Sequence, residues 1–156
     1  MEFEEIYKVY WDRVLRMCMG YVNHNDSAKD LAQDAFVLVY QNLSKFKYQS
    51  DIGTWIFKIA TNTCLKHLKK ESRLNNIDIN ILSATSESLN TDNEIQKLYQ
   101  FISELPEIDR IVILLELENL KQFEIANITG LSESNVRVKI HRIKQKLSKR
   151  FKSNES

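Results

Sequence analysis

The chain has 156 residues, of which 28% are charged, with three glycines, one proline and a formal net charge of +1. So few turn-forming residues exclude a sheet of many strands, and the composition favours an all-α protein of one domain or two small ones. The charge is unevenly distributed: residues 45–73 hold seven Lys and Arg against two acids, residues 74–96 hold no Lys or Arg, and residues 136–152 hold eight and no acid. Two basic blocks predict contact with a polyanion at two places.

Two amphipathic helices are expected first. Apolar residues recur at helical spacing over residues 3–21, which predicts a helix that ends near residues 23–25. Asp26 or Ser27 can cap a second helix. Its inner stripe is Ala28, Leu31, Ala32, Ala35, Phe36, Val39, Tyr40 and Leu43. Its other face carries Asp30, Gln33, Asp34, Val37 and Gln41. The residues alone favour a solvated surface over a binding role for that face.

A third helix follows a loop at residues 46–53, and Thr54 can cap it. Its predicted inner face is Ile56, Ile59, Ala60, Thr63 and Cys64, and its outer face is Lys58, Asn62, Leu65, Lys66 and Lys69, with Trp55 beside them. The loop adds Lys45, Phe46, Lys47 and Tyr48. Interleaved cations and rings suit single-stranded nucleic acid, because charge binds phosphates and rings stack on bases. A lysine-rich solvated surface over aromatic core residues explains the same pattern equally well.

The two cysteines, Cys18 and Cys64, lie within apolar helical patterns and are expected to be small buried side chains. Cys64 and His67 could share a helix face, but a structural zinc site needs four ligands and the sequence offers no second cluster. We therefore expect no metal and no cofactor. The sequence has no secretory or membrane-spanning apolar run, which makes a reduced cytoplasm the expected location.

The middle of the chain predicts a domain boundary. Residues 72–93 are rich in Asn, Asp, Ser and Thr and are expected to form a flexible linker between two small helical domains, residues 1–71 and 94–152, with a short tail at 153–156. Helical periodicity resumes at residues 95–105, stops at Pro106 and continues at 108–117. These two helical segments are expected to support the last two helices of the chain.

The C-terminal segment predicts a helix-turn-helix. Residues 123–129 form a short helix with the small Ala126 at its centre, and Gly130 supplies the turn. Ser132 is the expected N-cap of the next helix, with Leu131 and Val136 as a hydrophobic staple. An ordinary helical hairpin is the alternative. The order of small residue, glycine, cap, staple and acid-free basic helix favours DNA binding.

The second helix of this motif is the expected reader of the DNA major groove. Its buried stripe is Val136, Ile140, Ile143 and Leu147. Because the N-terminal part of such a helix enters the groove, the side chains placed for base edges are Ser134, Arg137, Val138, His141 and Arg142. The later lysines are placed for phosphates, and the exposed apolar Val138 suits a thymine methyl group.

Residues 28–43, AKDLAQDAFVLVYQNL, and 54–70, TWIFKIATNTCLKHLKK, resemble the second conserved region of the extracytoplasmic-function class of bacterial sigma factors. Residues 104–147, ELPEIDRIVILLELENLKQFEIANITGLSESNVRVKIHRIKQKL, resemble the fourth region. The order and spacing of the blocks extend the resemblance over nearly the whole chain. It implies an alternative sigma factor that binds core RNA polymerase and promoter DNA, melts the minus-ten element and is held inactive by an anti-sigma factor.

The resemblance also assigns residues to these contacts. The face that would dock on the clamp helices of core polymerase is Asp30, Gln33, Asp34 and Val37. The candidates for the minus-ten element are Lys47, Tyr48, Ser50, Trp55, Lys58, Asn62 and Lys66. The candidates for the minus-thirty-five element are Ser134, Asn135, Arg137, Val138, Lys139, His141, Arg142 and Lys146. The reader begins SESNV, and Val138 and His141 stand where the family usually has polar or aromatic residues, so the resemblance does not determine the minus-thirty-five sequence that this chain reads.

Two other classes of protein compete with this interpretation. A stand-alone transcriptional regulator with a helical sensor or dimerisation domain would share the helix-turn-helix, but it leaves the cation and aromatic pattern of the N-terminal half unexplained. An enzyme has little support, because Gly20, Gly53 and Gly130 stand alone and form no phosphate-binding loop. His24, His67 and His141 are also isolated from one another in the sequence.

Overall fold

The computed structural model describes residues 2–75 and 93–154. The described part contains seven α-helices and one short 3-10 helix, and no strand. An all-α fold of two small helical domains is therefore confirmed. Most of the predicted linker, residues 76–92, lies outside the described residues, while residues 72–75 continue the third helix.

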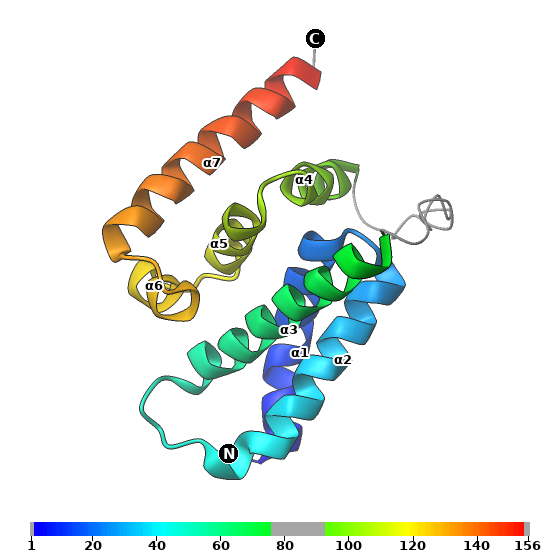
Figure 1. The fold of residues 1–156 in the computed structure, drawn as a ribbon. Helices are drawn as coiled ribbons and strands as arrows, with labels where there is room; N and C mark the ends of the chain where they lie inside the picture. The colour runs from blue at the N-terminus through cyan, green and yellow to red at the C-terminus, as the bar shows by residue number, and fades with distance from the viewer. Residues whose placement is uncertain (1, 76–92, 155–156) are drawn as a thin grey trace.

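The N-terminal domain consists of α1 (Phe3–Val22), α2 (Asn25–Asn42), the 3-10 turn η1 (Leu43–Lys45) and α3 (Ile52–Asn75). α2 packs against both α1 and α3, as Figure 1 shows. The predicted stripes meet in one core, in which Val14, Ala32 and Ile56 are fully buried. Phe57, which was not predicted for the inner face of α3, is also fully buried, whereas Ile59 is only partly buried. The left-handed backbone of Asn23 ends α1 through a hydrogen bond from its amide to the Met19 carbonyl.

The C-terminal domain consists of α4 (Asn93–Ser103), α5 (Glu107–Leu117), α6 (Gln122–Thr129) and α7 (Glu133–Asn154). α7 packs on α5, α6 and α4 and lies on the far side of this domain from α1–α3 (Figure 1). Its core includes Ile111, Leu115, Ile125 and Val136, all fully buried. Pro106 directly precedes α5. This agrees with the predicted break, because a proline disfavours helical backbone at the residue before it.

Three details of the sequence prediction are wrong. The N-cap of α2 is His24, whose Nδ1 accepts a hydrogen bond from the Ser27 amide at 3.2 Å, rather than Asp26 or Ser27. α3 begins at Ile52, so Thr54 lies inside the helix, and its hydroxyl donates to Glu124 of α6. Tyr40 is 66% exposed and is not part of the buried stripe of α2. Only the contact of Thr54 with Glu124 depends on a distant element, because the His24 cap joins residues three positions apart.

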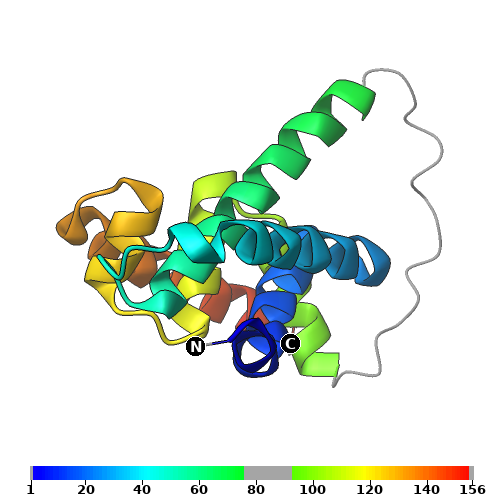
Figure 2. The ribbon, with the colours of Figure 1, turned by 90° about the horizontal axis from the view of Figure 1, so that it is seen from below.

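The two domains pack against each other. α1 contacts α4 and α5, and α3 contacts α6, so the four C-terminal helices lie along one side of the N-terminal three (Figures 1 and 2). Figure 2 also shows the C-terminal part of α3 extending beyond the other helices. One continuous set of buried side chains runs through both domains.

Candidate nucleic-acid interface

An aromatic cluster marks the loop between η1 and α3. The Phe46 ring lies 4.8 Å from the Tyr48 ring and 4.9 Å from the Trp55 ring, measured between centroids. Tyr48 has a φ of 57°, a left-handed backbone that is uncommon for a bulky residue, and 78% of it is exposed. The loop thus holds the Tyr48 ring out in solvent against Phe46, which in turn contacts Trp55. Such a ring offers a base a stacking surface, and strained backbone of this kind is concentrated at functional sites.

Two grooves flank Trp55, and basic side chains line both. The first lies between α2 and α3 and is lined by Leu38, Asn42, Lys45, Trp55, Ile59, Asn62, Thr63 and Lys66. The second lies under the loop and is lined by Lys45, Phe46, Lys47, Gln49, Ser50, Thr54, Trp55, Lys58 and Asn127. Each groove combines ammonium groups with the indole edge. This is the combination of charge and ring that a single strand requires.

The structure brings together all seven predicted minus-ten residues. Six of them line the two grooves, and Tyr48 lies in an adjoining hollow with Phe3, Tyr40 and Ile52. Lys58, Asn62 and Lys66 are exposed on one face of α3, at the spacing that the sequence predicted. Asn42, Gln49 and Asn127 were not predicted. Asn127 comes from the other domain, so no local signal could have placed it there.

The helix-turn-helix has the predicted turn geometry. Gly130 has a φ of 81°, and its amide donates to the Ala126 carbonyl at 2.8 Å, which closes α6. The Ser132 hydroxyl accepts a hydrogen bond from the Asn135 amide at 3.1 Å, so Ser132 caps α7 as predicted. Val136, Ile140, Ile143 and Leu147 are buried, which leaves the opposite face of α7 free to enter a groove.

Seven of the eight candidate minus-thirty-five residues are exposed along α7. They are Ser134, Asn135, Arg137, Val138, His141, Arg142 and Lys146. Val138 is 45% exposed although it is apolar. The eighth, Lys139, is turned toward α5, where its ammonium group lies 2.9 Å from the Asp109 carboxylate. Arg137 donates to Gln122 Oε1 at 3.4 Å, which holds its guanidinium beside the start of α6.

The outer face of α2 is an exposed acidic surface. Asp30, Gln33, Asp34 and Val37 all lie on it and are exposed, and Val37 is 52% exposed. The face is distinct from the inner stripe, whose members Leu31, Ala35 and Val39 are buried. A carboxylate-rich helix face around one apolar side chain suits a basic protein partner.

The two cysteines meet in the core of the N-terminal domain, with their sulfur atoms 4.0 Å apart and both side chains buried. The hydrogen bond with Cys18 and burial raise the pKa of the Cys64 thiol well above its usual value. A metal ligand must be a thiolate, so this environment disfavours metal binding. Residues 2–75 and 93–154 include no group of three or more His, Cys, Asp or Glu that could hold a metal ion. They also include no helix long and apolar enough to cross a membrane.

Comparison with known proteins agrees with both halves of the chain. Residues 6–74 match the family model of sigma-70 region 2, and residues 95–147 match that of sigma-70 region 4. The RNA polymerase sigma factor YlaC of Bacillus subtilis is 30% identical over 94% of this chain and 90% of its own length. The extracytoplasmic-function sigma factor SigW of the same organism is 28% identical over 96% of this chain and 89% of its own length.

The fold is also that of a solved sigma factor. The sigma factor RpoE of Bartonella quintana, in its complex with the anti-sigma factor NepR, matches with a TM-score of 0.82 at 18% identity over 96% of each chain. The chain therefore belongs to the extracytoplasmic-function class of bacterial RNA polymerase sigma factors, the subunits that direct core polymerase to promoters. The match of residues 6–74 to region 2 argues against a stand-alone regulator, because the helix-turn-helix alone would not explain that region.

Proposed function

We propose that the chain is an alternative sigma factor in which each of the three surfaces described above has its own function. The acidic face of α2 binds core polymerase, the loop and α3 capture the melted minus-ten element, and α7 reads the minus-thirty-five duplex. The observation that carries this proposal is the presence, in one chain, of two basic surfaces of different kinds. One combines rings with cations in grooves, and the other is a regular helix that ends in lysines.

The two surfaces would act on different states of DNA. On α7, Lys and Arg release counterions from the duplex, and each good base contact adds about 1–3 kcal/mol of discrimination. At the loop, Tyr48 and Trp55 would stack on unpaired bases at about 1–3 kcal/mol per base, which offsets a cost of a few kcal/mol for unstacking. The protein thus supplies recognition and strand capture, and we propose no covalent chemistry for it.

An anti-sigma factor is the proposed regulator, and the cytoplasm is the proposed location. The solved relatives carry such partners: RpoE of Bartonella quintana is bound to NepR, and CnrH, which matches with a TM-score of 0.73 at 21% identity, is bound to the cytosolic domain of CnrY. Either kind of partner would have to cover at least one of the three surfaces in order to silence this chain.

The decisive experiment is reconstitution. The purified protein is mixed with bacterial core polymerase and a library of promoter fragments, and new transcription starts are mapped. We expect starts that share paired minus-thirty-five and minus-ten elements. A footprint by the protein alone, without any new starts by the polymerase, would contradict the proposal.

A second experiment tests the core-binding face. Reversing both charges, Asp30→Lys with Asp34→Lys, should weaken binding to core polymerase at least tenfold, since like charges across an interface cost several kcal/mol. Both side chains are exposed, so the melting temperature should stay within a few degrees. The matched control is Glu5→Lys with Asp12→Lys, two exposed acids on α1 rather than on this face of α2. Equal losses from both pairs would remove the assignment.

A further inference from the structure

A glutamine of α6 contacts the first basic residue of α7. Gln122 is the first residue of α6, and its Oε1 accepts a hydrogen bond from Arg137 Nε at 3.4 Å. Both partners belong to the C-terminal domain. Val136, the residue before Arg137, is fully buried in the core, so packing fixes the backbone that carries Arg137. The contact therefore sets the direction of the guanidinium at the start of the proposed reader.

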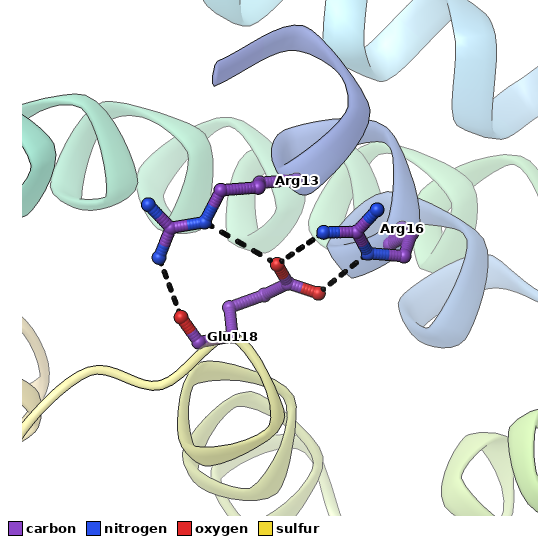
Figure 3. A network of polar contacts seen from close by, with 3 residues as sticks. All are labelled: Arg13, Arg16 and Glu118. Atoms are coloured by element: carbon purple, nitrogen blue, oxygen red, sulfur yellow. Dashed lines mark hydrogen bonds and ion pairs between the residues drawn. The ribbon is translucent and has the colours of Figure 1, made fainter. Parts of the chain in front are cut away.

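Two other cations of the chain are held by carboxylates instead. Arg16 donates through Nε and Nη2 to the two carboxylate oxygens of Glu118, at 3.0 Å in both cases (Figure 3). Lys139, two residues after Arg137, lies 2.9 Å from Asp109 Oδ1. In both pairs an acid cancels the positive charge, and in Arg16 it also occupies one edge of the guanidinium. Such contacts use a cation within the protein rather than for an outside ligand.

The amide of Gln122 has a different effect on Arg137. An amide oxygen has no net charge, so it orients the guanidinium and leaves the positive charge in place. The hydrogen bond uses the Nε proton, and the two terminal Nη groups keep their four N–H donors. These groups form a rigid planar fork that suits two neighbouring acceptors. Arg137 is thus oriented without being neutralised.

Guanine is the base that matches this fork. In the major groove it presents two acceptors side by side, O6 and N7, and a bidentate arginine is the commonest specific contact to them. The neighbouring Val138 is apolar and 45% exposed, so it adds no competing donor at this position. A guanidinium whose direction is already set also loses less rotamer freedom on binding.

We propose that Gln122 is a positioning residue for promoter recognition, which holds Arg137 so that the terminal Nη pair recognises a guanine at one position of the minus-thirty-five element. This role rests on the proposed function, in which α7 reads that element. Gln122 and Arg137 are 15 positions apart and lie on different helices. Sequence pattern alone therefore gives no reason to link Gln122 to base preference.

The test uses the full chain with core polymerase and a library of promoters randomised across the minus-thirty-five element, and the transcripts are sequenced. The parent protein should prefer guanine at the position that Arg137 contacts. Arg137→Ala should lower this preference about 5- to 150-fold, the range for one bidentate contact. Gln122→Ala should lower it about two- to tenfold, as for one neutral hydrogen bond, and leave the other positions unchanged. In the Arg137→Ala background, Gln122→Ala should have no further effect.

Two further variants separate the hydrogen bond from packing. Gln122→Met keeps the length and the helix propensity of the side chain but has no oxygen acceptor, so it should act like Gln122→Ala. Gln100→Met is the matched control, because it makes the same change at an exposed glutamine of α4, and it should leave the guanine preference unchanged. The melting temperature should stay within a few degrees in all these variants.

The outcomes distinguish this role from the proposed function. A guanine preference that Arg137→Ala abolishes and both Gln122 variants leave intact would overturn the positioning role alone. A uniform loss over all sequences with Arg137→Ala would also overturn it, because that is the behaviour of a phosphate contact. If the parent protein with core polymerase gives no promoter-specific transcripts, the proposed function is contradicted, and the role of Gln122 with it.

Discussion

The two proposed DNA-reading surfaces are built in different ways. The proposed reader α7 is one regular helix whose cap, buried stripe and exposed face follow from a single stretch of sequence. The proposed minus-ten surface is assembled from the end of α2, a loop with a left-handed residue at Tyr48, and the exposed face of α3. A rigid helix suits the regular major groove, whereas bases of an unpaired strand need rings and hollows supplied by several elements. The difference teaches that duplex reading can be encoded locally, while strand capture needs tertiary structure.

If the minus-ten surface depends on tertiary packing, a cavity in the core beneath this surface should abolish minus-ten capture before it affects binding of the minus-thirty-five duplex. Phe57 is fully buried in the core of the N-terminal domain, and Phe57→Ala should destabilise that domain by about 3–5 kcal/mol. Open-complex formation should be lost, while the isolated minus-thirty-five duplex is still bound. Thermal melting and duplex binding measure the two effects. Equal loss of both functions would show that the surfaces do not differ in this way.

Because the Tyr48 ring is exposed, its removal tests the minus-ten surface without a change in the stability of the fold. Tyr48→Ala should reduce open-complex formation about 5- to 150-fold, the equivalent of 1–3 kcal/mol of stacking on one base. Tyr48→Phe keeps the ring and should retain most of the activity. Permanganate footprinting of unpaired thymines measures the opened strand. A normal footprint with Tyr48→Ala would remove this residue from the site.

The reader helix should separate into base contacts and phosphate contacts. Arg142→Ala should relax base preference at one position of the minus-thirty-five element by about 1–3 kcal/mol. Lys146→Ala should weaken binding to all sequences alike and reduce the slope of log affinity against log salt by about 1. Binding to a duplex library at several salt concentrations distinguishes the two. If both variants act alike on every sequence, the assignment of base and phosphate contacts on α7 is wrong.

The smallest expected effect concerns the cap of α7. Ser132→Ala removes the hydroxyl that accepts from the Asn135 amide and should cost about 1 kcal/mol of stability. Ser132→Asn keeps a capping group and should recover most of it. Because the reading residues follow directly, duplex affinity should fall slightly and minus-ten capture should stay unchanged. Chemical denaturation gives the free energy of unfolding, and no change with Ser132→Ala would show that the cap is not needed.

The sequence by itself determined the helices, the cap at Ser132, the turn at Gly130 and the exposed faces of α2, α3 and α7. These features depend on residues three or four positions apart, or on the backbone freedom of one glycine, so local chemistry encodes them. Resemblance to the second and fourth conserved regions of sigma factors then assigned one basic surface to the minus-ten element and the other to the minus-thirty-five element.

Only the tertiary structure decided how the domains meet. Arg16 and Glu118 are 102 positions apart, and neither belongs to a pattern that would single it out. Gly20 lies in no turn that would explain it, yet it permits the close approach of α5. Thr54 reaches α6 because folding brings Glu124 within hydrogen-bonding distance. Such contacts depend on which surfaces pack together, a property of the whole molecule that no short stretch of sequence contains.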